Sequence, residues 1–164
     1  MRTIDTLTRY KAWADAVFFE CVSGLQEAQL VAAQPILFGS LIRTLHHSCL
    51  MDYAWKCNLL REPHGLTTRN PVEHPDFRTL RERQDAIDAW FVAYGSALSD
   101  SELDAEIEFE FIGGGQGRMS RADVLLHVVN HTTYHRGHAA DMLYHFGVMP
   151  PATDLPVFLR ETTQ

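Results

Sequence analysis

Four long stretches of the chain repeat apolar residues every three or four positions, which is the period of an amphipathic α-helix. They cover approximately residues 3–23, 35–61, 76–98 and 120–146. Gly24 and Gly147 directly follow the first and the last stretch, and glycine commonly ends a helix at such a position. Four long helices in one chain predict a helical bundle.

The apolar period changes to two at residues 106–111, where Glu alternates with Ile or Phe, and this predicts a β-strand. The glycine-rich run at 113–117 predicts a turn and therefore a hairpin. Residues 62–75 contain three prolines and a glycine, which predicts a long surface connection. We therefore predict an all-α fold: a four-helix bundle with one long crossover and a small β-hairpin before the last helix. We expect a single domain over residues 1–164.

Charge and cysteine content limit the partners and the compartment. The 21 acidic and 14 basic residues give a net charge of −7, whereas nucleic-acid binding needs clustered Lys and Arg; we expect no nucleic-acid partner. The longest uncharged run, 28–42, is shorter than the roughly 18 residues of a spanning helix, so we expect no membrane partner. Three cysteines without C-x-x-C spacing, and no signal-peptide pattern, predict a cytoplasmic protein with reduced thiols.

Histidine is abundant, with nine residues, and four of them lie in the last helical stretch. At about 100° per residue, these four fall within one sector of about 80°. They are His127, His131, His135 and His138. Two imidazoles four residues apart lie one helical turn apart and can bind one ion, as in H-E-x-x-H metalloproteases. No Glu lies between these histidines, so protease chemistry is not implied, and a solvated polar stripe is the alternative interpretation.

A metal site of this kind needs a third ligand from another part of the chain. The doublet His46-His47, in the middle of the second helical stretch, is the obvious donor. Adjacent helical residues point about 100° apart, so only one of the two normally enters the bundle. Periodicity does not choose between them.

The string N-H-T-T-Y-H-R-G at residues 130–137 is the most specific motif of the chain. Three other segments, at 9–15, 39–55 and 150–161, agree with it in order and spacing. Together they resemble the DinB family, a branch of the DinB/YfiT-like metalloenzyme superfamily, over nearly the whole chain.

The resemblance implies a four-helix bundle, commonly a homodimer, that carries one divalent transition-metal ion held by three histidines. It assigns one ligand to His47, five residues before Asp52, and the other two to His131 and His135. His46 is left outside the ligand set. Zinc or nickel is the expected ion, with iron or copper as alternatives, because imidazole-only ligation argues against magnesium and calcium.

Residues around these ligands receive less specific predictions. His138 stands where the family usually has Gln, and it either adds a fourth ligand or hydrogen-bonds a bound water. His127 has no assigned role. We expect Asp52 to form a salt bridge at the helix surface or bundle entry, with a place next to the metal ligands as the alternative. We expect Tyr134 to pack in the core, with a hydrogen bond to a metal-bound oxygen as the alternative. Arg136 either binds an anionic substrate or forms a buried ion pair.

The superfamily's characterised relatives resemble S-transferases and isomerases that use low-molecular-weight thiols. The chain is therefore predicted to be a metal-dependent enzyme that acts on a small molecule, such as a low-molecular-weight thiol, by thiol transfer or by hydrolysis. No catalytic residue and no organic cofactor is assigned. The alternative is a non-catalytic metal-binding protein of a stress response.

Overall fold

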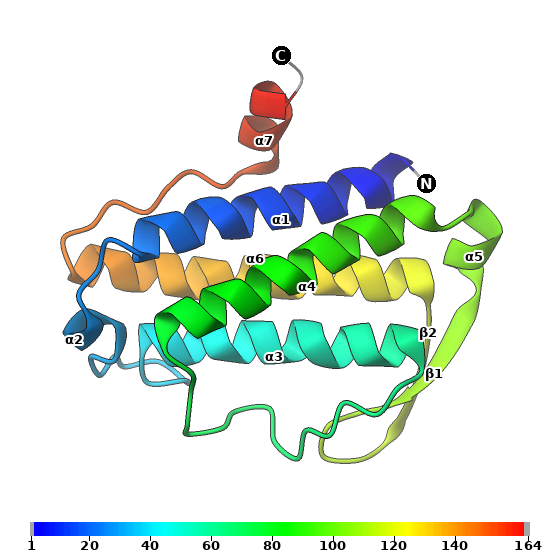
Figure 1. Cartoon of the computed structure of the whole chain (residues 1–164), viewed down its shortest axis with the longest axis horizontal. Coiled ribbons are helices and arrows are strands. Elements are labelled where there is room, and N and C mark those ends of the chain that lie inside the picture. Colours follow the sequence, from blue (N-terminus) through cyan, green and yellow to red (C-terminus); the bar gives the residue numbers. More distant parts are fainter. Residues whose placement is uncertain (1, 163–164) are drawn as a thin grey trace.

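Four long helices dominate the computed structural model, which describes residues 2–162 (Figure 1). The elements are α1 (Arg2–Val22), α2 (Glu27–Leu30), α3 (Leu41–Leu60), α4 (Phe77–Ala97), α5 (Asp100–Asp104), β1 (Glu106–Glu110), β2 (Gln116–Ser120), α6 (Arg121–His145) and α7 (Leu155–Thr162). The predicted fold, a helical bundle with one small hairpin before the last long helix, is confirmed. The short helices α2, α5 and α7 were not predicted, because segments of four to eight residues are too short to show a clear helical repeat.

The long helices form a four-membered bundle in which α1 and α3 each pack against both α4 and α6. In Figure 1, α1 and α6 run from right to left, whereas α3 and α4 run from left to right. Because α3 and α4 are parallel, the chain between them returns along the length of the bundle, over residues 61–76. This is the predicted long crossover, and it brings a loop alongside α3.

The second long helix begins at Leu41, later than the sequence predicts. Residues 34–39 form a closed turn instead, in which the amide of Gln34 donates to the carbonyl of Gly39 at 2.9 Å. Gly39 has a φ of +76°, a conformation that glycine adopts without strain. The turn places Phe38 in the interior, beside the histidines described below.

The hairpin is joined directly to α6. Ser120 ends β2 and caps α6, and its hydroxyl oxygen accepts a hydrogen bond from the amide of Asp123 at 3.0 Å. In β1, Ile107 and Phe109 point into the core and the glutamates point outward. The strand pairing is antiparallel and sets Phe109 opposite Gly117.

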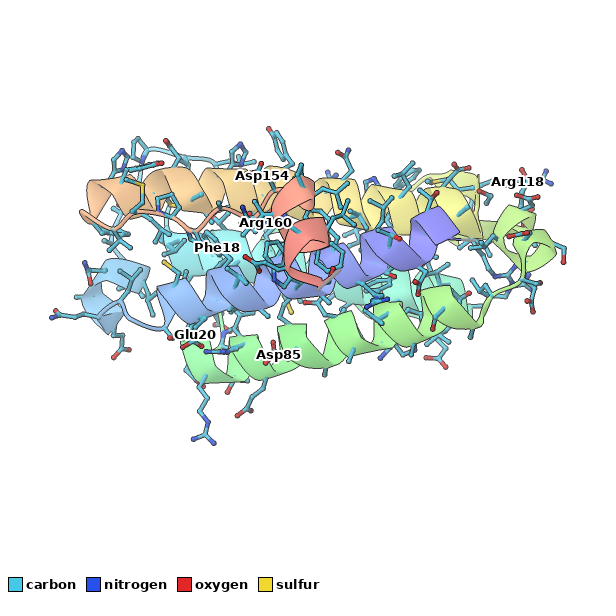
Figure 2. All side chains as sticks on the ribbon, turned by 90° about the horizontal axis from the view of Figure 1, so that it is seen from above. Phe18, Glu20, Asp85, Arg118, Asp154 and Arg160 are labelled. Carbon is cyan, nitrogen blue, oxygen red and sulfur yellow. The ribbon has the colours of Figure 1, made fainter. Side chains whose placement is uncertain are left out.

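The C-terminal segment covers one side of α1, as Figure 2 shows for α7. Phe158 of α7 is buried against Tyr10 and Trp13, with ring centroids 6.0 and 5.6 Å away. The hydroxyl of Tyr10 donates to the carbonyl of Thr153 at 2.9 Å. The tail segment that resembles the family therefore folds back as part of the bundle.

Among residues 2–162, none of the helices combines the length and the apolar character that crossing a membrane requires.

Candidate metal centre

Three histidine rings from two helices converge inside the bundle. His47 comes from α3, and His131 and His135 come from successive turns of α6. One ring nitrogen from each residue lies within 4.8 Å of the other two. The Nε2 atoms of His131 and His135 are 3.1 Å apart, and the His47 ring centroid is 4.6 Å from that of His135. We call these three residues the histidine triad.

The orientation of His47 is fixed by the crossover. Its Nδ1–H donates to the backbone carbonyl of Arg69 at 2.9 Å. A carbonyl oxygen only accepts hydrogen bonds, so the proton of this neutral ring is on Nδ1 and the lone pair is on Nε2. The Phe38 ring stacks on His47 with centroids 4.4 Å apart and meets His135 edge-on at 5.3 Å. His47 thus carries its lone pair on Nε2, as a metal ligand that binds through this atom needs.

Burial keeps the triad neutral. It lowers the pKa of His131 to about 3 and that of His135 to about 4, and it also lowers the pKa of His47. Neighbouring histidines depress the pKa of His131 and His135 further. Neutral imidazole is the form that binds a metal, so these rings need not lose a proton near pH 7.

The geometry fits a shared ion. Two nitrogens that are each about 2.0–2.1 Å from one tetrahedral ion are about 3.3 Å apart. The 3.1 Å between the two Nε2 atoms of α6 is close to that separation, although it also suits a hydrogen bond between two neutral imidazoles. A hydrogen-bonded pair gives no reason for a third ring, and the position of His47 therefore favours a cation.

The adjacent residues His46 and His47 of α3 lie in two different environments. His46 is as buried as His47, yet it belongs to no cation-binding group among residues 2–162. Burial, the largest effect, and the neighbouring His74 and Arg83 lower its pKa to about 4, and it hydrogen-bonds the backbone at Glu73. His47, and not His46, therefore faces α6.

The remaining histidines of α6 flank the triad. The His127 ring lies 5.6 Å from His131 and meets Trp55 edge-on at 5.0 Å. His138 lies 5.6 Å from His135 and 4.4 Å from Tyr134, outside the group of converging nitrogens. The prediction that Tyr134 packs in the core is wrong: 62% of it is exposed, because it lies on the outer face of α6.

A cleft of about 260 Å³ opens from the triad, and we call it the histidine cleft. His47 and His131 line it together with His127, and Trp55 of α3 and Phe109 of the hairpin form apolar walls. These two aromatic rings meet edge-on at 4.8 Å. The cleft gives a small molecule access to two of the three histidines.

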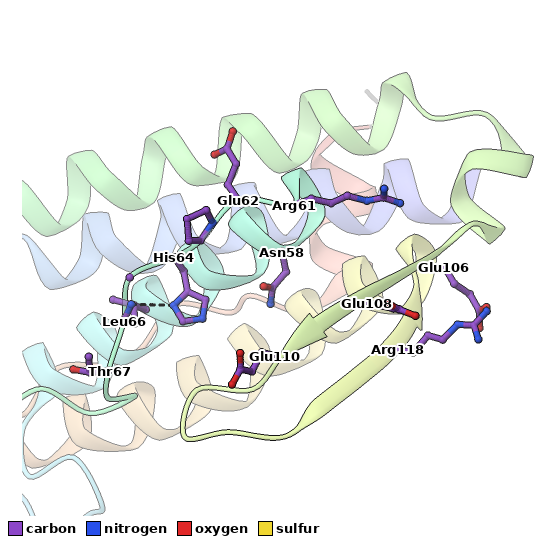
Figure 3. A pocket seen from close by; sticks show the side chains of 12 residues that line it. Asn58, Arg61, Glu62, His64, Leu66, Thr67, Glu106, Glu108, Glu110 and Arg118 are labelled. Carbon is purple, nitrogen blue, oxygen red and sulfur yellow. Dashed lines mark hydrogen bonds and ion pairs between the residues drawn. The ribbon is translucent and has the colours of Figure 1, made fainter.

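A larger hollow of about 870 Å³ adjoins this cleft and shares Asn58, His64 and Glu110 with it. Figure 3 shows this hollow. The end of α3 and the crossover lie on one side of it, and Glu108 and Glu110 of β1 lie on the other. None of the triad lines the larger hollow, so the smaller cleft is the candidate reaction site.

A buried ionic network lies beside the triad in the bundle core. The ammonium of Lys11 contacts the carboxylates of Asp15 at 2.9 Å, Asp52 at 2.7 Å and Asp88. Arg136 donates to Asp15 at 2.9 Å. The side chains of Gln84 and Thr132 donate to Asp52 at 3.0 and 3.2 Å. Together, these residues join all four long helices.

The position of Asp52 corrects a prediction. It is completely buried at the bundle centre rather than at the surface or entry. Burial raises its pKa, and the ammonium of Lys11 partly offsets this effect. Arg136 forms a buried ion pair with Asp15, which was one of its two predicted roles.

The network leaves one negative charge in excess, because three carboxylates meet two cations. Burial raises the pKa of Asp88 to about 8, against the opposing effect of Lys11. Burial alone lowers the pKa of Lys11, but the surrounding carboxylates outweigh it and hold that pKa well above its usual value. Asp88 is therefore the carboxyl that holds a proton at neutral pH, while Lys11 stays charged.

The four-helix bundle with its long crossover and the histidine triad define a class of protein. Its members are helical bundles in which three imidazoles converge at a cleft, an arrangement compatible with metal binding. The profile of the DinB family matches residues 1–164, and the chain belongs to the DinB family. The protein DinB of Bacillus subtilis (strain 168) is 25% identical to this chain over an alignment 164 residues long. The alignment covers 95% of this chain and 93% of that protein.

A solved structure shares the fold. The crystal structure of a DinB-like protein from Bacillus cereus ATCC 10987 aligns with a TM-score of 0.64 at 19% identity. The alignment covers 85% of this chain and 90% of that chain.

Proposed function

We propose that this protein is a metal-dependent enzyme that acts on a small molecule by thiol transfer or by hydrolysis. Its ion is held by His47, His131 and His135. The convergence of three neutral imidazoles at the histidine cleft carries this proposal. Three imidazole ligands leave a coordination position for a substrate or water, as catalytic sites do.

The donor set also limits the ion. Imidazole nitrogens suit zinc, nickel, copper and iron, and we propose zinc or nickel. Such an ion, when bound, polarises a carbonyl group or stabilises a thiolate, so that a nucleophile is available at neutral pH. The protein orients His47 through the Arg69 carbonyl and keeps all three rings neutral by burial.

The size and walls of the cleft favour a compact substrate with an apolar part. A volume of about 260 Å³ lies just below the usual range of small-molecule sites, about 300–1,000 Å³. Trp55 and Phe109 offer aromatic surface, and His127 offers a polar group beside His131. A low-molecular-weight thiol fits this chemistry. We also propose that the protein is a homodimer with a single domain, as the family resemblance implies. The free cysteines support a cytoplasmic location.

Metal analysis tests the ligand set. Protein made without a histidine tag is dialysed against Zn²⁺ or Ni²⁺, and one ion per chain is expected. His131→Ala and His135→Ala should lose the ion while keeping their helical circular dichroism. His138→Ala, on the same helix, is the matched control and should keep it. Retention of the ion by either triad variant contradicts the proposed ligands.

Turnover tests the enzymatic part. The metal-free and reloaded proteins are compared on a panel of thiol conjugations and of ester and amide hydrolyses. Turnover that appears only after reloading, and disappears in His131→Ala, is the expected result. A stoichiometric ion with no turnover would instead favour the non-catalytic metal-binding protein.

A further inference from the structure

A small internal cavity lies among α1, α3, α4 and α6, apart from the histidine cleft. His135 and Ser48 line it, and the ionic network contributes Asp15, Gln84 and Arg136 to its wall. All of these side chains are at most 7% exposed, so little of the cavity wall faces bulk solvent. Its volume of about 10 Å³ is close to the least that holds one water molecule, about 10–15 Å³.

Two buried polar atoms on residues of this cavity have no hydrogen-bond partner within residues 2–162. They are the hydroxyl oxygen of Ser48 and Nδ1 of His135. A buried donor or acceptor that is left without a hydrogen bond destabilises the folded state. Much of the wall is apolar, because it includes Phe18, Phe19 and Leu45. The polar side chains of Asp15, Gln84 and Thr132 also line it and offer a water molecule further groups to bond.

The ring of His135 belongs both to the triad and to the wall of the cavity. Its Nε2 lies 3.1 Å from Nε2 of His131, on the side where the three rings converge. His135 lines the internal cavity but not the histidine cleft. The unpartnered Nδ1 is on the other edge of the ring and is therefore the atom available to the cavity.

We propose that one water molecule occupies this cavity, accepts a hydrogen bond from Nδ1–H of His135 and is held by the hydroxyl of Ser48. Ser48 is then a positioning residue: through the water it keeps the proton of His135 on Nδ1 and the lone pair on Nε2. The inference rests on the proposed function only in taking Nε2 of His135 as a ligand atom.

A water molecule whose two protons go to the Ser48 hydroxyl oxygen and to the Asp15 carboxylate of the wall can only accept from His135. It then does for His135 what the Arg69 carbonyl does for His47. Groups that hold the second nitrogen of a ligating histidine fix its tautomer and ring orientation, and their loss typically weakens metal binding 10- to 100-fold. The cavity wall also includes Thr132, which donates to Asp52 of the ionic network. The water therefore links a triad histidine to the polar core of the bundle.

The water itself is tested in the metal-free protein. A high-resolution crystal structure should show one ordered water within hydrogen-bond distance of Ser48 Oγ and His135 Nδ1. Nitrogen NMR of the imidazoles should show His135 protonated at Nδ1. A dry cavity overturns the proposal, whether or not the protein binds metal.

The role of Ser48 is tested with Ser48→Ala. Cys49→Ala is the matched control, because it removes one heavy atom from the next buried residue of α3, which does not line the cavity. We expect Ser48→Ala to mix the tautomers of His135 in the metal-free protein and to weaken Zn²⁺ binding by about 10- to 100-fold in chelator competition. Cys49→Ala should change neither.

Unchanged tautomer and affinity in Ser48→Ala would overturn the positioning role. If the unmodified chain binds no Zn²⁺, the proposed function fails, and the crystal structure and the NMR spectra still decide the water and its effect on His135. Thermal unfolding of both variants shows whether lost affinity reflects lost folding.

Discussion

Nδ1 of His47 donates a hydrogen bond of 2.9 Å to the backbone carbonyl of Arg69. This contact joins α3 to the long crossover, and it explains why the crossover matters for the site. The bond uses the backbone of Arg69, so it does not depend on the side chain of that residue. It also distinguishes the surroundings of His47 from those of His46, although the two residues are adjacent and equally buried.

Replacing these two histidines one at a time should separate their roles. His47→Ala removes one of three converging nitrogens, and we expect it to abolish stoichiometric Zn²⁺ binding. His46→Ala should keep the ion, because His46 belongs to no cation-binding group in the described part of the chain. Metal content after dialysis is the measurement. Loss of the ion in His46→Ala with retention in His47→Ala would reverse the assignment.

The side chain of Arg69 should be dispensable for the ion. Arg69→Ala keeps the carbonyl that accepts from His47, so its Zn²⁺ affinity should equal that of the unmodified chain. The side chain lines the histidine cleft, so any effect should fall on substrate KM. Chelator competition and steady-state kinetics measure the two quantities. A clear fall in metal affinity would show that the carbonyl alone does not orient His47.

The ionic network makes an asymmetric prediction for its carboxylates. Asp88 holds a proton at neutral pH, so Asp88→Asn replaces one neutral group by another and should cost at most about 1 kcal/mol. Asp52→Asn removes a charged partner of buried Lys11 and should cost about 3–5 kcal/mol. Urea unfolding at pH 7 measures both. Equal costs would mean that the proton that offsets the excess negative charge is not held at Asp88.

Most of the fold was predictable because long helices leave a clear periodic signal. The spacing of four between His131 and His135 likewise predicted that they share a helix face. The choice within the doublet His46-His47 came from family resemblance, because both side chains are buried and periodicity cannot separate them. The Arg69 carbonyl lies in a loop without a repeat, so no sequence pattern indicated its contact.

The sequence of α1 also contains a pattern that indicates part of the ionic network. The buried positions of α1 repeat at steps of three and four, and Lys11 and Asp15 occupy two of them, between Thr8 and Phe18. A charged residue on an apolar stripe needs a buried partner. This pattern predicts an internal ion pair, but it does not say which helix supplies the remaining partners.

The stability of the metal-free protein should pass through a maximum near pH 7. Burial lowers the pKa of His46, His131 and His135 from 6.5 to about 4, 3 and 4. Below pH 6.5 the unfolded chain therefore binds more protons than the folded one, and stability falls as the pH falls.

Asp88 acts in the opposite direction. Its pKa is raised from 3.8 to about 8, so between these values the folded state holds a proton that the unfolded state lacks. Its contribution to stability is lost as the pH rises. Below pH 6.5 the histidines outweigh it. Above about pH 7, where the histidines are mostly neutral in both the folded and the unfolded state, Asp88 has the larger effect. Urea midpoints at pH 5, 7 and 8 measure the curve, and Asp88→Asn should remove the fall above pH 7; a steady rise to pH 8 would contradict this.

Replacing Gly117 or Gly137 by alanine should change the free energy of unfolding in opposite directions. At Gly117 a Cβ atom would lie 2.5 Å from the ring of Phe109, which packs against Trp55 in the cleft wall. Because that ring must move, Gly117→Ala should cost about 1–3 kcal/mol and alter substrate KM. At Gly137, inside α6, a Cβ atom meets nothing within 4 Å, so Gly137→Ala should add roughly 0.5–1 kcal/mol through helix propensity. Urea unfolding measures both, and a stable Gly117→Ala variant with unchanged KM would show that the hairpin yields without moving Phe109.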